Sequence, residues 1–398
     1  MDDLGQTMRH RKRLLLISQY FPVHIGGVEQ QVYCLAQHLQ ATMDVHYLTV
    51  SNRPIESREP GITVSTIPDR QRLRSLFGLC YLLDYSRLWK TMQRIDPHII
   101  YLQGACAYMG IAARYARSSP CTLIWHIASS YDVQPFRVRL LRTIPFDYID
   151  KRMIEYGIRH ADYIFGQAKY EEDLLRRNYG RTCDLIVGNW HPEPTVPCTK
   201  EPPVKVLWVA NIKPLKKPET FIDLAERLGT VTEAEFLMIG RPGDAKYQGR
   251  LEARMRKVRG LTYLGEKSNE EINRLLARSH LFVNTSDYEG FPNTFVQAWL
   301  HEVPVVSLHV DPDDLLARQG LGFHSGSLDK LVQDTRIMIE NADLRARIGK
   351  KAKAYAREHH SLAKNLNQVA AFFERISRTQ AKDTHGGAVE TWAIARDS

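Results

Sequence analysis

Residues 14–39 read LLLISQYFPVHIGGVEQQVYCLAQHL. The run Leu14–Ser18 is apolar and short, which is typical of a strand buried on both faces of a parallel sheet. The loop Gln19–Gly27 follows, and Val28–Leu39 has its apolar residues at helical spacing. A strand, a glycine loop and a helix in this order predict the first unit of a doubly wound α/β fold.

The same alternation continues along the chain. Short apolar runs predict further strands at Val45–Val50, Ile62–Ile67, Ile99–Leu102, Cys121–Trp125 and Tyr163–Gly166. A second series of predicted strands lies at Lys205–Ala210, Phe236–Gly240, Leu261–Leu264, Leu281–Asn284 and Val303–Leu308. Helices are expected at Pro218–Leu228, 245–258, Asn269–Arg278, Thr294–Leu300 and Leu344–Ile376. The pattern predicts two Rossmann-like parallel sheets facing a cleft.

A proline-rich stretch, HPEPTVPCTKEPP at residues 191–203, separates the two series. Prolines lack a backbone donor and hold the chain extended, as in a connector. The sequence predicts an N-terminal extension (1–11), a first Rossmann-like domain (12–190), a linker (191–203) and a second Rossmann-like domain (204–354). A helix (355–376) and a tail expected to be disordered (377–398) follow.

Composition favours a water-soluble protein of two domains. The chain has 398 residues, of which 43% are hydrophobic and 25% charged. No apolar run approaches the roughly 18 residues of a membrane-spanning helix, and the start lacks the apolar core of a secretory signal. The six cysteines have no metal-ligand spacing, which favours reduced thiols. A cytoplasmic location is therefore expected.

The net charge of +9 favours an anionic partner. A nucleotide diphosphate, an anionic membrane face and nucleic acid all fit a basic protein. Nucleic acid is not expected, because the sequence has no helix-turn-helix, aromatic platform or zinc module.

Residues 287–306 read DYEGFPNTFVQAWLHEVPVV and begin just after the predicted strand Leu281–Asn284. Backbone N–H groups from Asn293 to Phe295 start a helix here, and a helix start is an anion site suited to phosphate. Glu289 is a poor neighbour for phosphate but a good acceptor for sugar hydroxyls.

This segment resembles the Glu-x7-Glu region of the retaining glycosyltransferases of family 4, of the bacterial polysaccharide-biosynthesis type. The resemblance implies a GT-B fold and makes Glu289 the carboxylate that holds hydroxyls of the donor sugar. Donor-binding positions carried over from the same segment are Pro292, Asn293, Thr294 and Gln297. The family has a second glutamate, for the ribose, where this chain has Gln297, and a glycine where it has Glu302.

The loop VANIKPLKKP, residues 209–218, follows the first strand of the second series. A departing diphosphate gains negative charge, so a fixed cation beside it stabilises the transition state more than the ground state. Lys216 matches the lysine of the family's G-R-x4-K-G-like segment. The arginine of that segment is replaced by Asn211, and Lys213 is the candidate to supply the missing charge.

The loop PVHIGGVE, residues 22–29, resembles the family's P-x-x-G-G-x-E/A loop beside the donor phosphates and the acceptor. Gly26 and Gly27 let the backbone approach a ligand closely. His126, directly after the predicted strand Cys121–Trp125, matches the family's strand-end histidine. We expect it to point into the cleft and donate a hydrogen bond to the transferred sugar.

The loop after the predicted strand Leu261–Leu264 resembles the family's base-binding loop. Its matching residues are Gly265, Glu266 and Lys267. The tetrapeptide DPDD at 311–314 has the letters of a metal motif, but its position favours a helix cap.

The resemblance implies transfer of a sugar from a UDP- or GDP-sugar to a glycan or lipid-linked saccharide, with retention and without a metal or other cofactor. It makes 12–190 the acceptor domain, 204–354 the donor domain, and 355–376 a helix that crosses back to the first domain. The alternative is a catalytically weak or inactive GT-B binding protein, because Asn211, Gln297 and Glu302 depart from the pattern.

Two segments of the first domain mix basic with aromatic and aliphatic residues, namely 70–90 and 134–152. This composition is typical of a surface in peripheral contact with an anionic membrane. Packing helices with solvated basic faces explain it equally well.

Overall fold

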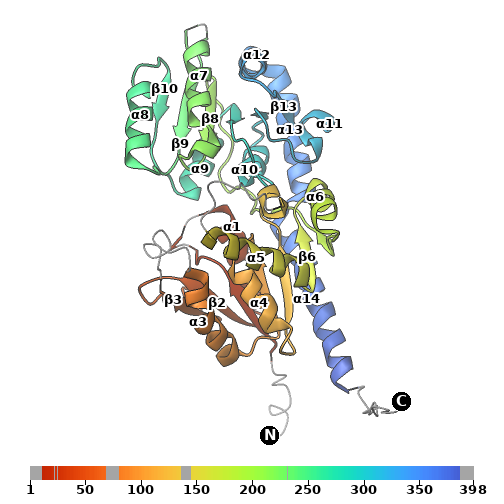
Figure 1. The fold of residues 1–398 in the computed structure, drawn as a ribbon. Coiled ribbons are helices and arrows are strands. Elements are labelled where there is room, and N and C mark those ends of the chain that lie inside the picture. Colours follow the sequence, from red (N-terminus) through yellow and green to blue (C-terminus); the bar gives the residue numbers. More distant parts are fainter. Residues whose placement is uncertain are drawn as a thin grey trace, which may run out of the picture.

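The computed structural model describes residues 11–21, 23–24, 26–68, 80–135, 145–230 and 232–385. These residues form two parallel sheets, each with helices on both faces (Figure 1). We call the sheet β1–β7 with its helices the first lobe, and the sheet β8–β13 with its helices the second lobe. The predicted α/β class and its two doubly wound sheets are confirmed.

The first sheet has the order β3-β2-β1-β4-β5-β6-β7. Its strands are β1 (Arg13–Ile17), β2 (Asp44–Val50), β3 (Ile62–Ile67), β4 (Ile99–Gln103), β5 (Thr122–His126), β6 (Tyr163–Gly166) and β7 (Leu185–Ile186). Its helices are α1 (Gly27–Leu39), α3 (Cys80–Ile95), α4 (Tyr108–Ala116), α5 (Pro145–His160) and α6 (Lys169–Tyr179), with a 3₁₀ turn at Ser130–Val133.

The second sheet has the order β10-β9-β8-β11-β12-β13. Its strands are β8 (Lys205–Val209), β9 (Glu235–Ile239), β10 (Leu261–Tyr263), β11 (Leu281–Asn284), β12 (Val305–Ser307) and β13 (Gly322–His324). Its helices are α7 (Pro218–Leu228), α8 (Ala245–Met255), α9 (Asn269–Leu276), α10 (Asn293–Leu300), α11 (Leu315–Arg318), α12 (Leu328–Glu340) and α13 (Ala342–His359), with 3₁₀ turns at Pro214–Lys216 and Pro312–Asp314.

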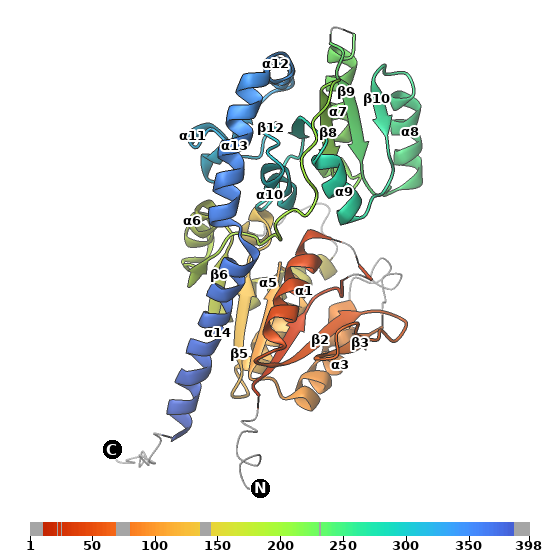
Figure 2. The ribbon, with the colours of Figure 1, turned by 180° about the vertical axis from the view of Figure 1, so that it is seen from behind.

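Side-chain alternation along β1 explains the layers. Leu15 and Ile17 pack into a core shared with α3 and α4, whereas Leu14 and Leu16 pack into a core on the opposite face. Successive strand residues point to opposite faces, so an apolar run without polar gaps needs helices on both sides. In the first lobe α1 covers the second face together with α14 (Leu362–His385), the last described helix of the chain (Figure 2).

The C-terminal stretch differs from the single helix expected at Leu344–Ile376. It consists of α13 and α14, which are separated at His360 and Ser361. The break is held by the connector, because the His191 N–H donates to His360 O and the Leu362 N–H donates to His191 O. The change of direction lets α13 pack on α10 and α14 pack on the first sheet.

The last helix is longer than predicted. The helix α14 runs to His385, past the end predicted at Ile376, because no glycine or proline interrupts the chain before Gly386. The elements β7, β13 and α12 were not predicted. The expected linker, 191–203, lies between the last strand of the first sheet and the first strand of the second. Most of the predicted extension, residues 1–10, and the tail after His385 lie outside the described residues.

The packing of α13 on the second lobe depends on a glycine. A Cβ at Gly349 would lie 2.3 Å from Glu302 O, whereas a Cβ at Gly249 in α8 would meet no atom within 4 Å. Both glycines lie inside helices, where alanine is otherwise preferred by about 1 kcal/mol.

We expect Gly349→Ala to lower the free energy of unfolding by about 1–3 kcal/mol, because α13 must move away from the turn at Glu302. Gly249→Ala is the matched control and should raise it by about 0.5–1 kcal/mol. Urea denaturation of the two variants measures both values. Equal changes in the two variants would contradict the close approach of α13 to Glu302.

Candidate active site

The candidate site lies where strand-end loops of the two lobes meet. The Ser130 hydroxyl, after β5, donates to Glu289 O, after β11, at 3.0 Å. A Cβ at Gly290 would lie 2.3 Å from Ala128 O, so the loop after β11 lies against first-lobe backbone. Ligands of open α/β sheets bind beyond the carboxyl ends of the strands, and here both sheets present those ends to one region.

Lys216 and Glu289 form an ion pair at this junction. Lys216 Nζ contacts Glu289 Oε1, and the Ser286 hydroxyl donates to the same carboxylate oxygen at 2.7 Å. Both side chains are mostly buried, with 20% and 19% of their surface exposed. The sequence assigned these two residues to one site, and the structure brings them into contact.

Side-chain to backbone bonds hold the two loops together. The Thr285 hydroxyl donates to Lys216 O at 2.7 Å and to Lys217 O at 3.0 Å. The Trp208 indole N–H donates to the Thr285 hydroxyl at 2.9 Å. The position of the Lys216 backbone therefore depends on a buried threonine, which sequence reasoning did not identify.

The neighbouring Lys217 forms a second ion pair that the sequence analysis missed. Its Nζ lies 2.5 Å from Asp287 Oδ1. By contrast, Asn211 and Lys213 are exposed, and Lys213 forms no ion pair within the described ranges. An uncompensated cation on this loop fits the expectation that Lys213 meets an anionic ligand.

The helix start at Pro292 differs in one respect from the expectation. Pro292 is the N-cap of α10 and provides no side-chain cap. The Phe295 N–H donates to Pro292 O, so it is not free as expected. The N–H groups of Asn293 and Thr294 have no partner among the described residues, and they keep the character of an anion site.

The glycine loop of the first lobe contacts this helix start. A Cβ at Gly27 would lie 2.4 Å from Asn293 Nδ2, and Gly26 is the N-cap of α1. Asn293 Oδ1 lies 3.1 Å from His191 Nε2. Burial lowers the pKa of His191 to about 4, so its ring is neutral at pH 7 and adds no charge to the site.

His126 does not point into the open cleft as expected. Its side chain is fully buried, and its Nδ1 lies 2.5 Å from the Tyr101 hydroxyl. Burial lowers the pKa of His126 to about 3, so its ring is neutral. The aromatic rings of Phe165 and Trp190 pack around it, and its Nε2 has no hydrogen-bond partner in the part of the chain that the structure describes. Burial of this strand end, which depends on Trp190 from a distant segment, explains the difference.

Gln297 and Glu302 occupy the positions that depart from the family pattern. Gln297 is buried in α10, with 8% of its surface exposed. Glu302 has the left-handed φ of 56° that a glycine would adopt most easily. Its carboxylate pairs with Lys353 at 2.9 Å, which lowers the pKa of Glu302. Glu302 therefore binds α13 rather than lining the site.

The loop after β10 lies at the same edge of the second sheet as the lysine loop. Gly265 has φ 74°, and a Cβ there would meet no atom within 4 Å. Glu266 pairs with Arg241 at 2.8 Å, and Lys267 lies 3.6 Å from Glu271. Arg241 was not identified from the sequence.

A cavity of about 190 Å³ lies between the two lobes at the site and is lined by residues of both. It is lined by Gly27, Val28, Gln31, Gln103, Ala128, Gln167, Asn189, Glu289, Gly290, Phe291, Pro292 and Asn293. Of the predicted site residues, Gly27, Glu289, Pro292 and Asn293 line it. The others, including Gly26, Lys216, His126, Gln297 and Lys213, lie outside this lining.

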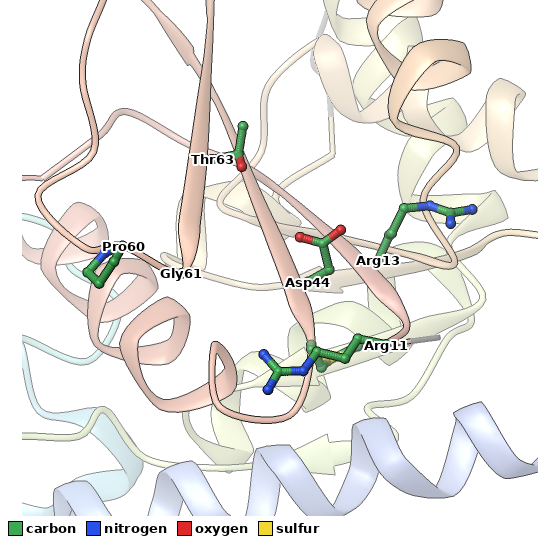
Figure 3. Close-up of a pocket in the computed structure, with 7 residues that line it drawn as sticks. Arg11, Arg13, Asp44, Pro60, Gly61 and Thr63 are labelled. Atoms are coloured by element: carbon green, nitrogen blue, oxygen red, sulfur yellow. The ribbon is translucent and has the colours of Figure 1, made fainter. Parts of the chain in front are cut away.

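A larger cavity, of about 380 Å³, lies at the amino ends of β1, β2 and β3 (Figure 3). Arg11, Arg13 and Asp44 line it, and Arg13 pairs with Asp96 at 2.6 Å. This is the sheet edge opposite to the carboxyl ends, so the cavity does not belong to the candidate site.

The carboxylates of DPDD act as helix caps. Asp313 accepts from the backbone N–H groups of Lys169 at 2.8 Å and Tyr170 at 2.7 Å, at the start of α6. Asp311 accepts from the Leu316 N–H at 2.8 Å.

Within the described ranges, no group of three or more acidic, histidine or cysteine side chains could hold a metal ion. In the same residues, no helix is long and apolar enough to span a bilayer.

Two protein-family models match the chain. The model of Glycosyltransferase Family 4 matches residues 25–187, and the model of Glycosyl transferases group 1 matches residues 203–341. An uncharacterised glycosyltransferase of Methanocaldococcus jannaschii is 22% identical over 376 residues, which are 92% of this chain and 99% of the relative.

Solved structures of similar fold cover nearly the whole chain. Sucrose-phosphate synthase from Thermosynechococcus elongatus has a TM-score of 0.76 at 14% identity, over 93% of this chain and all of that one. Anabaena HepE in complex with UDP and glucose has a TM-score of 0.69 at 17% identity, over 92% of this chain and all of that one. The chain therefore has the GT-B fold and belongs to the group 1, family 4 glycosyltransferases.

Proposed function

We propose that this glycosyltransferase takes a sugar from a UDP- or GDP-sugar and transfers it, with retention, to a glycan or lipid-linked saccharide. The observation that carries the proposal is the contact of Lys216 with Glu289 beside the start of α10. Glu289 provides a carboxylate for the sugar hydroxyls. Lys216 and the free N–H groups at the start of α10 provide positive charge for the phosphates, so the site matches both halves of a nucleotide sugar.

Each group has a separate task in this proposal. Glu289 lines the cavity and accepts hydrogen bonds from hydroxyls of the donor sugar. Lys216 has three N–H donors, so it can keep its bond to Glu289 and also donate to the diphosphate. The N–H groups of Asn293 and Thr294 add the positive end of the helix dipole. Charge that develops on the departing diphosphate is thereby stabilised.

The lining of the cavity supports same-face attack as the route to retention. Glu289 is the charged side chain among its lining residues, and it is already bound by Lys216 and Ser286. Retaining glycosidases, which form a covalent glycosyl intermediate, use two carboxylates about 5 Å apart. In the scheme that the family resemblance implies, the departing diphosphate takes the acceptor proton instead. The proposal needs no metal ion.

A panel of donors tests the function. UDP-glucose, UDP-galactose, UDP-N-acetylglucosamine and GDP-mannose are incubated with the protein in excess EDTA, and nucleotide release and melting temperature are measured. We expect at least one donor to release nucleotide and to stabilise the protein, by about 2.7 kcal/mol at 100 times its dissociation constant. Binding without release would favour the second candidate function, an inactive binding protein, which the exposed Asn211 and the neutral Gln297 suggest. Absence of both binding and release would refute the proposal.

Lys216→Ala and Glu289→Ala should each lower kcat at least roughly tenfold with the best donor, because each removes a group that stabilises the transition state. Lys257→Ala is the control, since Lys257 is exposed and forms no ion pair in the described residues. Steady-state kinetics gives kcat, and melting temperatures verify that each variant is folded. Near-normal rates in both alanine variants at the site would rule out the assignment.

Peripheral membrane contact is proposed for the face of α4 and α5. Arg114, Arg152 and Arg159 line a cavity of about 360 Å³ together with Ile149, Met153 and Tyr156. Glu155 also lines it and pairs with Arg152 at 3.0 Å, which leaves Arg114 and Arg159 as its other charged residues. Basic residues around an apolar patch fit anionic lipid headgroups. Residues 70–79 and 136–144 of the two segments that suggested this contact lie outside the described residues.

The double variant Arg114→Gln/Arg159→Gln should bind vesicles containing phosphatidylserine roughly thirtyfold more weakly, since each basic residue near such a surface contributes about 1 kcal/mol. Flotation at low salt measures the bound fraction, and phosphatidylcholine vesicles are the control. If the unmodified protein does not float with the anionic vesicles, the membrane proposal fails.

A further inference from the structure

Five side-chain amides line the cavity that contains Glu289, namely Gln31, Gln103, Gln167, Asn189 and Asn293. Both polar atoms of the Gln31 side chain have a partner, because Nε2 donates to Trp190 O and Oε1 accepts from the Trp190 N–H, both at 2.9 Å. This amide therefore holds the chain at Trp190 in place.

Gln167 and Asn189 hold the loop that follows Glu289. Gln167 Nε2 donates to Ile127 O at 3.0 Å, and its Oε1 accepts from the Phe291 N–H at 3.2 Å. Asn189 Nδ2 donates to Phe291 O at 2.9 Å. These two side chains therefore connect first-lobe residues to the loop of the second lobe.

Gln103 differs from the other four amides, each of which has at least one side-chain hydrogen bond. Its side chain is 7% exposed, and neither its Nε2 nor its Oε1 has a hydrogen-bond partner among the described residues. It is the last residue of β4 and is paired in register with His126 of β5. A buried amide without a partner costs about 1–3 kcal/mol, so an unpaired amide among the residues that line a cavity points to a polar ligand there.

The walls of the cavity limit the chemistry of that ligand. Glu289 is the charged residue among its lining residues, and its charge is balanced by Lys216 outside the lining. The cavity of about 190 Å³ is larger than the roughly 10–15 Å³ that one water needs. Apart from the helix start at Pro292 and Asn293, where the N–H groups favour phosphate, these walls fit a neutral ligand that carries several hydroxyl groups.

We propose that Gln103 binds hydroxyl groups of the transferred sugar and determines which sugar the enzyme accepts. This inference rests on the proposed function. A carboxylate such as Glu289 only accepts hydrogen bonds, whereas the amide of Gln103 both donates and accepts them. The two side chains together therefore favour a sugar whose neighbouring hydroxyl groups point toward both of them. A site that hydrogen-bonds a hydroxyl discriminates strongly against a substrate that lacks it or places it elsewhere.

The test is Gln103→Met, which keeps the length of the side chain and removes both hydrogen-bonding atoms. With the best donor of the panel, kcat/KM should fall at least roughly tenfold, and the preference for that donor over its epimer should fall by a similar factor. The dissociation constant of the free nucleoside diphosphate should change less than about twofold, because the phosphates bind elsewhere in the proposed site. The melting temperature should stay equal or rise, since an unpaired buried amide is removed.

Gln31→Met is the matched control. It changes another buried amide of the same cavity, one whose Nε2 and Oε1 are both bonded to the Trp190 backbone. We expect it to lower the melting temperature, because the buried Trp190 backbone groups lose their partners. The opposite directions of the two shifts separate a ligand-binding amide from a structural one.

The outcomes distinguish the two levels of the proposal. If the unmodified protein neither binds nor turns over a donor of the panel, the proposed function fails and this inference fails with it. If donors are turned over but Gln103→Met keeps the kcat/KM and the epimer preference, the function stands and the role of Gln103 is wrong. If Gln103→Met weakens the binding of the free nucleoside diphosphate as much as the binding of the donor, the proposed role is also wrong. Gln103 would then affect the structure of the whole site rather than bind the sugar.

Discussion

The contact between Lys216 and Glu289 is the interaction on which the rest of the site depends. It joins the loop after β8 to the loop after β11, and buried bonds of Thr285 fix the backbone beneath it. A mostly buried lysine and glutamate tolerate desolvation because each compensates the other. The pair therefore keeps a cation and a carboxylate side by side at the mouth of a cavity whose other lining residues are neutral.

The first lobe completes the site by holding the loop at Glu289–Phe291. Ser130, Gln167 and Asn189 all bond to the backbone of this loop, and Gly290 lies against Ala128. The chain returns to the first lobe through α14, so the two lobes are connected twice, by the connector and by the break at His360. Relative movement of the lobes would change the cavity and these bonds together.

Much of the fold could be predicted from the sequence because buried parallel strands are apolar runs between polar loops. The strands at Ile62–Ile67, Tyr163–Gly166 and Leu281–Asn284 have the predicted bounds. The placement of Lys216 and Glu289 at one site was also predicted, since both follow strands at one sheet edge. The burial of His126 could not be predicted, because it depends on residues from distant segments that pack around the end of β5. The unpaired amide of Gln103 could not be predicted either, because it depends on which distant residues reach the end of β4.

A crystal structure of the protein with a bound, slowly hydrolysed analogue of its best nucleotide sugar tests the central claim most directly. We expect diphosphate oxygens within hydrogen-bonding distance of Lys216 Nζ and of the N–H groups of Asn293 and Thr294. We also expect a sugar hydroxyl on the Glu289 carboxylate. A nucleotide sugar bound away from the junction of the two lobes, for example among Arg11, Arg13 and Asp44, would contradict the central claim.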